Sequence, residues 1–323
     1  MLEIVLDSPG KFSRREAEAP VAAGECALVR IHRVGICGTD LHAFKGRQPF
    51  FSYPRVLGHE LGVEVVSAPA GSGLQPGDRC AVEPYINCQE CRSCLAGNPN
   101  CCERLQVLGV HTDGGMRPYL SIPARLLHKS SKLSLDQLAL VETLGIGAHA
   151  VQRSGIGAGQ RALIIGAGPI GLAVLQFVQA AGATAVVREL SASRRAFVER
   201  LGAETQATPH ADLFETVFDA TGSTRSMEAS FESVNFNGRL IFVGLVTDRI
   251  SFDDTLFHRR EMTLYASRNS CRDFPRIISM IESGAVDTTP WITDRLRLTD
   301  VVDEFPTLYE RDALVKAMIE VDG

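Results

Sequence analysis

The chain has 323 residues, of which 22% are charged and 45% hydrophobic, and its formal net charge is −5. This composition is ordinary for a globular protein, and the length allows two domains with separate cores. The acidic balance argues against nucleic-acid binding, which needs clustered positive charge. Neither a secretory signal nor an apolar run long enough to span a membrane is recognisable, so we expect a cytoplasmic protein.

Residues 1 to about 130 are predicted to form short strands. Strands are expected at Cys26–Val34, Gly62–Val66 and Arg79–Glu83, with turns rich in glycine, proline and aspartate between them. Short β-type segments separated by frequent turn signals are typical of a small antiparallel β-domain.

Four cysteines, Cys88, Cys91, Cys94 and Cys102, protrude from this domain with the spacing C-x2-C-x2-C-x7-C. Two-residue spacers let one loop wrap thiolates around a single zinc ion, whereas a disulfide is disfavoured in a reducing compartment. The neighbouring Cys101 could replace Cys102, although the longer spacing is favoured. Four thiolates leave no open position for substrate, so this zinc is predicted to be structural.

Beyond about Leu135 the pattern changes to alternating helices and strands, which implies βαβ units and a parallel sheet. Residues 201–218 look too short for a full connection, so one helix on a sheet face is expected to be trimmed or lost. After about Ser267 the chain is expected to return to the first domain. The predicted elements are Leu135–Ser154, Arg161–Ile165, Leu172–Ala181, Ala185–Val187, Ala192–Leu201, Thr216–Asp219, Ser226–Ser233, Arg239–Val243 and Arg272–Ser283.

A glycine-rich turn, Gly166-Ala167-Gly168-Pro169-Ile170-Gly171, joins a predicted strand to a predicted helix. Its first glycine allows the tight turn, its second lets a pyrophosphate approach, and its third lets the helix pack on the strand. The free N–H groups at the start of the helix favour a phosphate. The sequence therefore predicts a dinucleotide site.

Glu189 ends the next strand, about twenty residues further on, where a carboxylate would bind the ribose hydroxyls. Because this carboxylate repels a 2′-phosphate, NAD is predicted in preference to NADP. Arg188 and Arg194 weaken that argument, since a 2′-phosphate would favour arginines, and Arg194 is itself a candidate cofactor-binding residue. Glu189 could also be an ordinary solvated acid at a strand end.

Three further motifs complete a recognisable order: GICGTDLHAF (Gly35–Phe44), GHE (Gly58–Glu60) and VETLGIGAHA (Val141–Ala150). With the cysteine lobe after GHE and with the later GAGPIG, the chain resembles the zinc-dependent medium-chain dehydrogenase/reductases over essentially its whole length. It is most similar to their sorbitol, threonine and sugar-acid dehydrogenase branch. The resemblance implies a GroES-like β-rich catalytic domain at 1–143 with its zinc lobe at about 86–103, a Rossmann NAD-binding domain at 144–266, and a return to the catalytic domain at 267–323.

The resemblance also implies a second, catalytic zinc. Cys37 and His59 match two of its ligands, Glu142 stands at the third ligand position, and Glu60 either binds the metal or exchanges with substrate. Three protein ligands and one open position are what a catalytic zinc needs. Taken singly, these residues could equally be a buried cysteine, a core histidine and ordinary acids.

The remaining catalytic candidates come from the same resemblance. Thr39 matches the start of a proton relay from the alcohol, and His42 matches the point where the relay reaches solvent. Asp40 matches a carboxylate that orients His59. A hydrogen-bonded loop histidine is the alternative for His42.

Substrate selection is expected at the mouth between the domains. Arg268 could bind substrate hydroxyls or a carboxylate, or could merely pair with a surface acid. The candidates are Phe44, Phe50, Tyr53, His111, Ser267, Arg268 and Asn269.

The predicted activity is reversible oxidation of a secondary alcohol of a polyol, sugar or sugar acid by NAD. The enzyme should carry two zinc ions per chain and form a homodimer or homotetramer, with no nucleic-acid or membrane partner. Alternatives are a threonine-type or simple alcohol dehydrogenase, a zinc-independent quinone or enone reductase, and a non-catalytic nucleotide-binding redox sensor.

Overall fold

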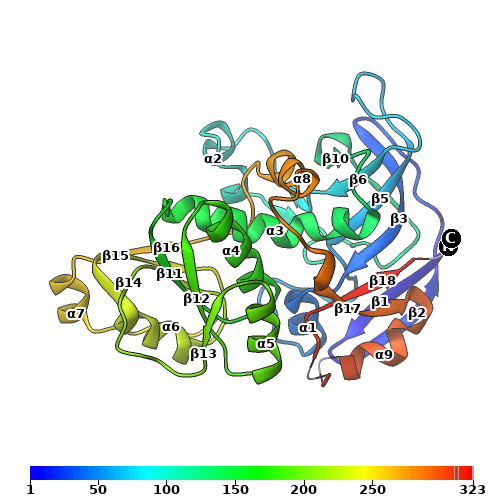
Figure 1. The fold of residues 1–323 in the computed structure, drawn as a ribbon. Coiled ribbons are helices and arrows are strands. Elements are labelled where there is room, and N and C mark those ends of the chain that lie inside the picture. The colour runs from blue at the N-terminus through cyan, green and yellow to red at the C-terminus, as the bar shows by residue number, and fades with distance from the viewer. Residues whose placement is uncertain (309, 312, 322–323) are drawn as a thin grey trace. The chain divides into compact units, whose positions relative to one another are not determined.

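The computed structural model describes residues 1–308, 310–311 and 313–321 (Figure 1). The chain divides into two compact units, Met1–Glu142 with Phe274–Gly323, and Thr143–Asp273. The second unit continues beyond residue 266, the domain end expected from the sequence, because Ser267 N–H still donates to the Phe242 carbonyl oxygen (2.9 Å).

The first unit is built on a seven-stranded sheet in the order β10-β6-β5-β3-β18-β17, in which β9 also pairs with β3. Along β3 the buried Ala27, Val29 and Ile31 alternate with less buried residues, so one face of the strand packs into the core. The strands are β3 (Cys26–Gly35), β5 (Glu60–Ser67), β6 (Arg79–Val82), β9 (Tyr119–Pro123), β10 (Leu127–Lys129), β17 (Ile292–Arg297) and β18 (Lys316–Glu320).

The C-terminal segment joins this sheet. β18 runs antiparallel to β3, with Met318 opposite Gly35, and β17 runs parallel to β18. The helix α9 (Val301–Leu308) contributes the fully buried Phe305 to the same core. The main sheet of the first unit is therefore mainly antiparallel, with one parallel pair that the sequence pattern did not indicate.

Smaller elements complete the first unit. A three-stranded sheet has the order β2-β1-β4, and a two-stranded sheet pairs β7 with β8. Their bounds, with those of the helices, are β1 (Leu2–Ser8), β2 (Lys11–Glu16), β4 (Arg55–Val56), β7 (Tyr85–Ile86), β8 (Gln106–Val107), α1 (Gly38–Phe44), α2 (Arg92–Leu95) and α8 (Phe274–Glu282).

The second unit contains a six-stranded parallel sheet in the order β13-β12-β11-β14-β15-β16. The strand order reverses between β11 and β14, and nucleotides bind at such a reversal. Right-handed crossovers put α4 and α5 on one face and α6 and α7 on the other. The elements are β11 (Arg161–Ile165), α4 (Pro169–Ala180), β12 (Thr184–Arg188), α5 (Ala192–Arg200), β13 (Glu204–Gln206), β14 (Phe214–Asp219), α6 (Thr224–Ser230), β15 (Val234–Phe242), α7 (Asp254–Arg259) and β16 (Thr263–Ala266).

The connection from β13 to β14 is short, as expected. Residues 207–213, all of them described, contain no helix, so one face of the sheet has no crossover helix at this point. The helix α4 begins at Pro169, three residues before the predicted start at Leu172. Proline suits the first helical position because its missing N–H would have no partner there.

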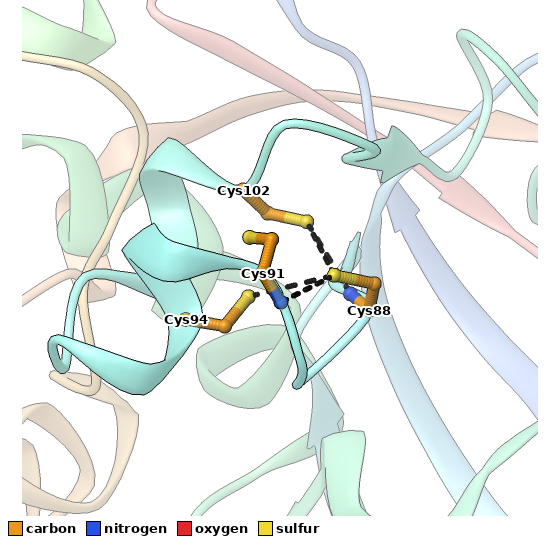
Figure 2. Close-up of side chains that lie close together, drawn as sticks. All are labelled: Cys88, Cys91, Cys94 and Cys102. Carbon is orange, nitrogen blue, oxygen red and sulfur yellow. Dashed lines mark hydrogen bonds between the residues drawn. The ribbon is translucent and has the colours of Figure 1, made fainter.

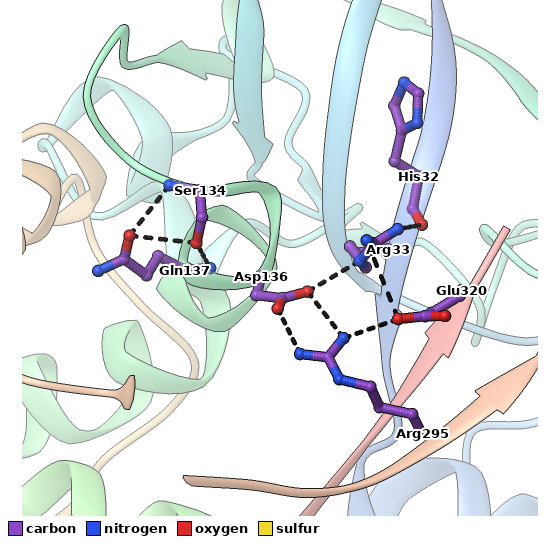
Figure 3. A network of polar contacts seen from close by, with 7 residues as sticks. All are labelled: His32, Arg33, Ser134, Asp136, Gln137, Arg295 and Glu320. Carbon is purple, nitrogen blue, oxygen red and sulfur yellow. Dashed lines mark hydrogen bonds and ion pairs between the residues drawn. The ribbon is translucent and has the colours of Figure 1, made fainter. Parts of the chain in front are cut away.

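The long helix α3 (Leu135–Ser154) has the predicted bounds, and its start is fixed by a capping box (Figure 3). Ser134 N–H donates to Gln137 Oε1 (3.0 Å), and Gln137 N–H donates to Ser134 Oγ (3.2 Å). These two bonds satisfy backbone groups that would otherwise lack partners at a helix start.

Asp136, in the first turn of α3, connects the helix to the sheet of the first unit (Figure 3). It accepts from Arg33 Nε of β3 (2.8 Å) and from Arg295 Nη2 of β17 (2.5 Å). Arg295 also donates to Glu320 of β18 (2.9 Å). Partial burial acts to raise the pKa of Asp136, but Arg295 and then Arg33 outweigh it and lower that pKa.

Asp136→Asn should therefore lower the free energy of unfolding by about 1 kcal/mol at pH 7. A lowered folded-state pKa gives stability that is present above the unfolded-state pKa of about 4 and is lost as pH falls through the folded-state value. The difference between variant and wild type should thus shrink in acid, as measured by urea unfolding across pH. Asp303→Asn, which removes one side of the exposed pair with Arg14, is the control and should cost less. A difference that grows as pH falls would contradict the prediction.

Candidate active site

The four lobe cysteines converge in space (Figure 2). All four sulfur atoms lie within 4.8 Å of one another, with Cys88 Sγ 4.0 Å from Cys94 Sγ and 3.5 Å from Cys102 Sγ. Four sulfurs at 2.3 Å from a tetrahedral zinc ion would be separated by about 3.8 Å. Cys101 is exposed and lies outside the group, so Cys102 is its fourth member. No cysteine of the described residues forms a disulfide.

Backbone amides surround these sulfurs. Cys91 N–H donates to Cys88 Sγ (3.4 Å), and Cys88 N–H donates to Cys102 Sγ (3.3 Å). The backbone N–H of Glu90, followed by that of Cys91, lowers the pKa of Cys88 to about 6. Burial instead raises the pKa of Cys94 to about 12. Amide donors stabilise thiolates, which are the form that binds zinc, so the group fits a closed structural site.

A second group of side chains that could hold a metal ion lies within the first unit. Ligand atoms of Cys37, His59 and Glu60 are all within 4.8 Å of one another. Cys37 caps the start of α1, where its N–H donates to Asp40 Oδ2 (2.9 Å), and His59 and Glu60 stand at the start of β5. His59 and Glu60 are buried. A thiol, an imidazole and a carboxylate form the mixed ligand set typical of catalytic zinc.

Asp40 faces His59, as the sequence predicts. Its Oδ1 lies 3.7 Å from His59 Nδ1, and both atoms are buried without a hydrogen-bond partner among the described residues. Burial acts to lower the pKa of His59, but Asp40 and then Cys37 outweigh it and raise that pKa well above its usual value. Since Nδ1 faces Asp40, Nε2 is the nitrogen available to a metal ion. This environment fits a metal-binding histidine with a supporting carboxylate.

The carboxylate of Glu60, a member of the group, and that of Glu142, outside it, have different partners. Lys316 Nζ donates to both oxygens of Glu60, at 2.6 and 2.7 Å. Glu142, buried on α3, instead accepts a hydrogen bond from the Tyr85 hydroxyl, and it lies outside the group of three. Sequence reasoning did not identify Lys316 or Tyr85. The only signal for Lys316 is a lysine at the start of an otherwise apolar strand segment, KAMI.

The two relay candidates lie one turn apart on α1. Thr39 is half-buried and His42 is exposed, and a spacing of three residues puts them on the same side of the helix. Partial burial of the ring, followed by Arg47 and Lys45, lowers the pKa of His42. This shift favours the neutral form of His42, which can accept a proton, and the relay itself stays a prediction.

The candidate substrate residues are distributed over both units. Phe44 stacks on Phe12 (5.5 Å between ring centroids) and also contacts Phe305, so it has a packing role. His111 is exposed, and its Nδ1 accepts from Val107 N–H (3.0 Å). Exposed Phe50 and half-buried Tyr53 also belong to the first unit. Arg268 and Asn269 belong to the second unit, in the turn after β16. Substrate contact by any of them remains a prediction.

The glycine-rich turn of the second unit has the geometry of a phosphate cradle. It connects β11 to α4, and a Cβ atom on Gly171 would lie 1.9 Å from the Gly166 carbonyl oxygen. A Cβ atom on Gly168, by contrast, would meet nothing within 4 Å. Gly171 therefore permits close packing, while the backbone at Gly168 is open to a ligand, which is how a dinucleotide turn works.

Glu189 is held beside this turn by two backbone amides. Ala167 N–H donates to its Oε2 and Ser191 N–H to its Oε1, both at 2.8 Å. Arg188 points elsewhere: it is buried and donates to Ser233 Oγ (3.1 Å) and, with the amide of Gln206 reoriented, to that side chain. The interpretation of Arg188 as a possible 2′-phosphate ligand is therefore wrong, because its guanidinium is used within the core.

Arg194, in the first turn of α5, is the remaining basic candidate for the cofactor. It is half-buried, and its guanidinium contacts no partner in the part of the chain that the structure describes. Its role in cofactor binding stays a prediction.

Comparison with known proteins agrees with this geometry. Residues 23–132 match the alcohol dehydrogenase GroES-like domain family, and residues 169–283 match the zinc-binding dehydrogenase family. The chain is 36% identical to L-galactonate-5-dehydrogenase of Escherichia coli, over 96% of this chain and 95% of that protein. It is 30% identical to L-arabinitol 4-dehydrogenase of Aspergillus oryzae, over 86% of this chain and 81% of that protein.

Among solved structures, a putative zinc-binding dehydrogenase from Sinorhizobium meliloti bound to NADP is 28% identical, with a TM-score of 0.90 and coverage of 99% of this chain and 98% of that chain. The chain therefore belongs to the zinc-type medium-chain dehydrogenase/reductases. Within them it falls in the sorbitol and sugar-acid dehydrogenase branch, which confirms the resemblance seen in the sequence. None of the helices in the described residues is long and apolar enough to cross a membrane.

Proposed function

We propose that this dehydrogenase oxidises a secondary hydroxyl of a sugar acid to a ketone, reversibly, with NAD and a catalytic zinc ion. The observation that carries the proposal is the group of half-buried Cys37 with buried His59 and Glu60, whose ligand atoms lie within 4.8 Å of one another. A zinc-independent reductase or a non-catalytic nucleotide-binding protein would have no need of such a group.

A sugar acid is proposed ahead of a neutral polyol because of the relatives. The protein named for L-galactonate, a sugar acid, is 36% identical over nearly the whole chain, whereas the one named for L-arabinitol is 30% identical. Both names describe oxidation at a secondary hydroxyl of a polyhydroxylated carbon chain. A polyol remains the second candidate.

The zinc ion, when bound by Cys37, His59 and a third protein ligand, would make the substrate hydroxyl more acidic. The dinucleotide, when bound at the glycine-rich turn, would accept the hydride. Asp40 orients the imidazole of His59 through its position 3.7 Å from Nδ1. Thr39 and His42 accept the proton that leaves the hydroxyl, and His42 passes it to solvent. The lowered pKa of His42 suits a proton acceptor that must be neutral near pH 7.

The test is an activity screen of the purified enzyme with NAD, in which the rate of NADH formation is measured for each substrate. The substrates are L-galactonate, L-arabinitol, sorbitol, L-threonine and 2,3-butanediol. We expect the highest kcat/KM with the sugar acid. A higher value with a polyol would overturn the sugar-acid assignment, and a higher value with threonine or the diol would favour the other dehydrogenase types. If no substrate yields NADH while the protein still binds NADH, the redox-sensor alternative would replace the proposal.

We further propose that Glu189 sets the preference for NAD. Its carboxylate is held beside the glycine-rich turn by the Ala167 and Ser191 amides, and two unit charges about 4 Å apart, such as this carboxylate and a 2′-phosphate, would repel by about 1–4 kcal/mol. Glu189→Gln should therefore lower the ratio of kcat/KM for NAD to that for NADP by at least about fivefold. Adding Arg194→Ala to the Glu189→Gln variant should lower its kcat/KM for NADP. Wild-type enzyme that prefers NADP would contradict this assignment.

A further inference from the structure

A buried acid, Asp219, lies at the end of β14, one of the two strands between which the order of the parallel sheet reverses. Its side chain is fully buried, at 0% exposure, and buried carboxylates need partners. A dinucleotide binds outside the carboxyl ends of the strands at such a reversal. Asp219 is therefore buried beneath the expected cofactor site, where it can act on the loops that surround it.

The Asp219 carboxylate accepts three hydrogen bonds from the segment that follows β14. Its Oδ1 accepts from Thr221 N–H (3.0 Å) and from the Thr221 hydroxyl (2.6 Å). Its Oδ2 accepts from the Ser226 hydroxyl on α6 (2.6 Å). Hydrogen bonds to an ionised acceptor are stronger than those between neutral groups. The carboxylate thus fixes both ends of segment 221–226.

This segment touches the loops on both sides of it. A Cβ atom on Gly166, in the glycine-rich turn, would lie 3.2 Å from Thr221 Cγ2. A Cβ atom on Gly244, after β15, would lie 2.4 Å from the Gly222 nitrogen. The Asp219 carbonyl oxygen also accepts from Gly244 N–H (3.0 Å). Because the three loops are in close contact, a shift of segment 221–226 would disturb the glycine-rich turn as well.

The charge of Asp219 faces that of Arg188 beneath the same loops. Both residues are aligned with Ile165, on opposite sides of β11, so their side chains belong to the same face of the sheet. Burial lowers the pKa of the Arg188 guanidinium, and the charge of Asp219 acts against this shift. Removal of one charge alone would leave the other buried and uncompensated, which is strongly unfavourable.

We propose that Asp219 is a positioning residue for the dinucleotide, because it holds segment 221–226 against the glycine-rich turn. Thr221 and Gly222 are exposed, so this segment forms part of the surface at the carboxyl end of the sheet. Asp219 is buried and acts through Thr221 rather than by contact with the cofactor. The inference rests on the proposed function, since it requires a dinucleotide at this end of the sheet.

The test replaces Asp219 by leucine, which has a similar shape but accepts no hydrogen bond. The dissociation constant of NADH is measured by fluorescence titration of the purified zinc-loaded enzyme. We expect it to rise at least about tenfold in Asp219→Leu. The kcat with L-galactonate at saturating NAD should stay within about threefold of wild type, because only binding is weakened. Asp212→Leu, which removes an exposed acid of the same unit, is the control and should match wild type.

A double variant keeps the test decisive if Asp219→Leu folds poorly. Arg188→Met with Asp219→Leu replaces both buried charges by apolar side chains, an exchange that is often neutral or favourable for stability. Its melting temperature should therefore return to within about 4 °C of the wild-type value. The dissociation constant of NADH should still be at least about tenfold above that of wild type, because the hydrogen bonds to segment 221–226 remain absent.

The outcomes separate this proposal from the proposed function. NADH binding of wild-type strength in folded Asp219→Leu would overturn the positioning role, while the dinucleotide site itself would stand. Recovery of both the melting temperature and NADH binding in the double variant would show that Asp219 acts on stability alone, with the same consequence. If wild type binds no NADH, the cofactor of the proposed function is itself refuted.

Discussion

Cys37→Ala should lower the zinc content from about two ions per chain to about one and should reduce kcat/KM by at least about a thousandfold. Half-buried Cys37 places its sulfur in a group that could hold a metal ion and whose other members are a buried imidazole and a buried carboxylate. Removal of the thiolate leaves too few ligands to hold the ion against competing water. The lobe cysteines form a separate group and should keep their own metal.

The measurement is metal analysis by mass spectrometry together with the sugar-acid and polyol assay. Cys101→Ser is the matched control, because Cys101 is exposed and belongs to neither group. It should keep both metal ions and full activity. Equal zinc content in wild type and Cys37→Ala, or full activity of the variant, would refute a catalytic zinc at this position.

The parts of the site that sequence could predict are those whose residues are close together in the chain. The glycine-rich turn occupies six consecutive residues, and Cys88 and Cys102 lie only fourteen positions apart. Local spacing constrains the geometry of such segments directly. The turn between β11 and α4 and the convergence of the four sulfurs follow from this.

The partners of buried charged side chains such as Glu60 and Arg188 could not be predicted in this way. Lys316 is 256 positions from Glu60, and the two meet only because β18 pairs with β3. Arg188 shows the same limit: its sequence position suggests a phosphate ligand, but its side chain is used by Ser233, on a later segment of the second unit. Strand pairing over long separations decides both cases, and periodicity does not report it.

The cysteine lobe should contribute to stability rather than to chemistry, and Cys94→Ser tests this. Cys94, on α2, is one of the two buried members of the group, and its loss leaves three thiolates without a complete tetrahedral shell. The variant should lose the lobe zinc and should be destabilised by at least about 3 kcal/mol, because binding of a structural zinc is itself folding free energy. Limited proteolysis should cut first within about residues 86–103.

Activity distinguishes this variant from Cys37→Ala. A closed shell of four thiolates offers no position to substrate, so kcat of Cys94→Ser measured well below its melting temperature should stay within about threefold of wild type. The melting temperature and the zinc content of Cys94→Ser measure its loss of stability and of metal, and Cys101→Ser again serves as the control. Loss of kcat in Cys94→Ser while the protein remains folded and retains the Cys37 metal would show that the lobe takes part in catalysis. The two metal groups are thus separable by experiment, since Cys37→Ala should lose activity while keeping the lobe zinc, and Cys94→Ser should lose the lobe zinc and stability while nearly keeping kcat.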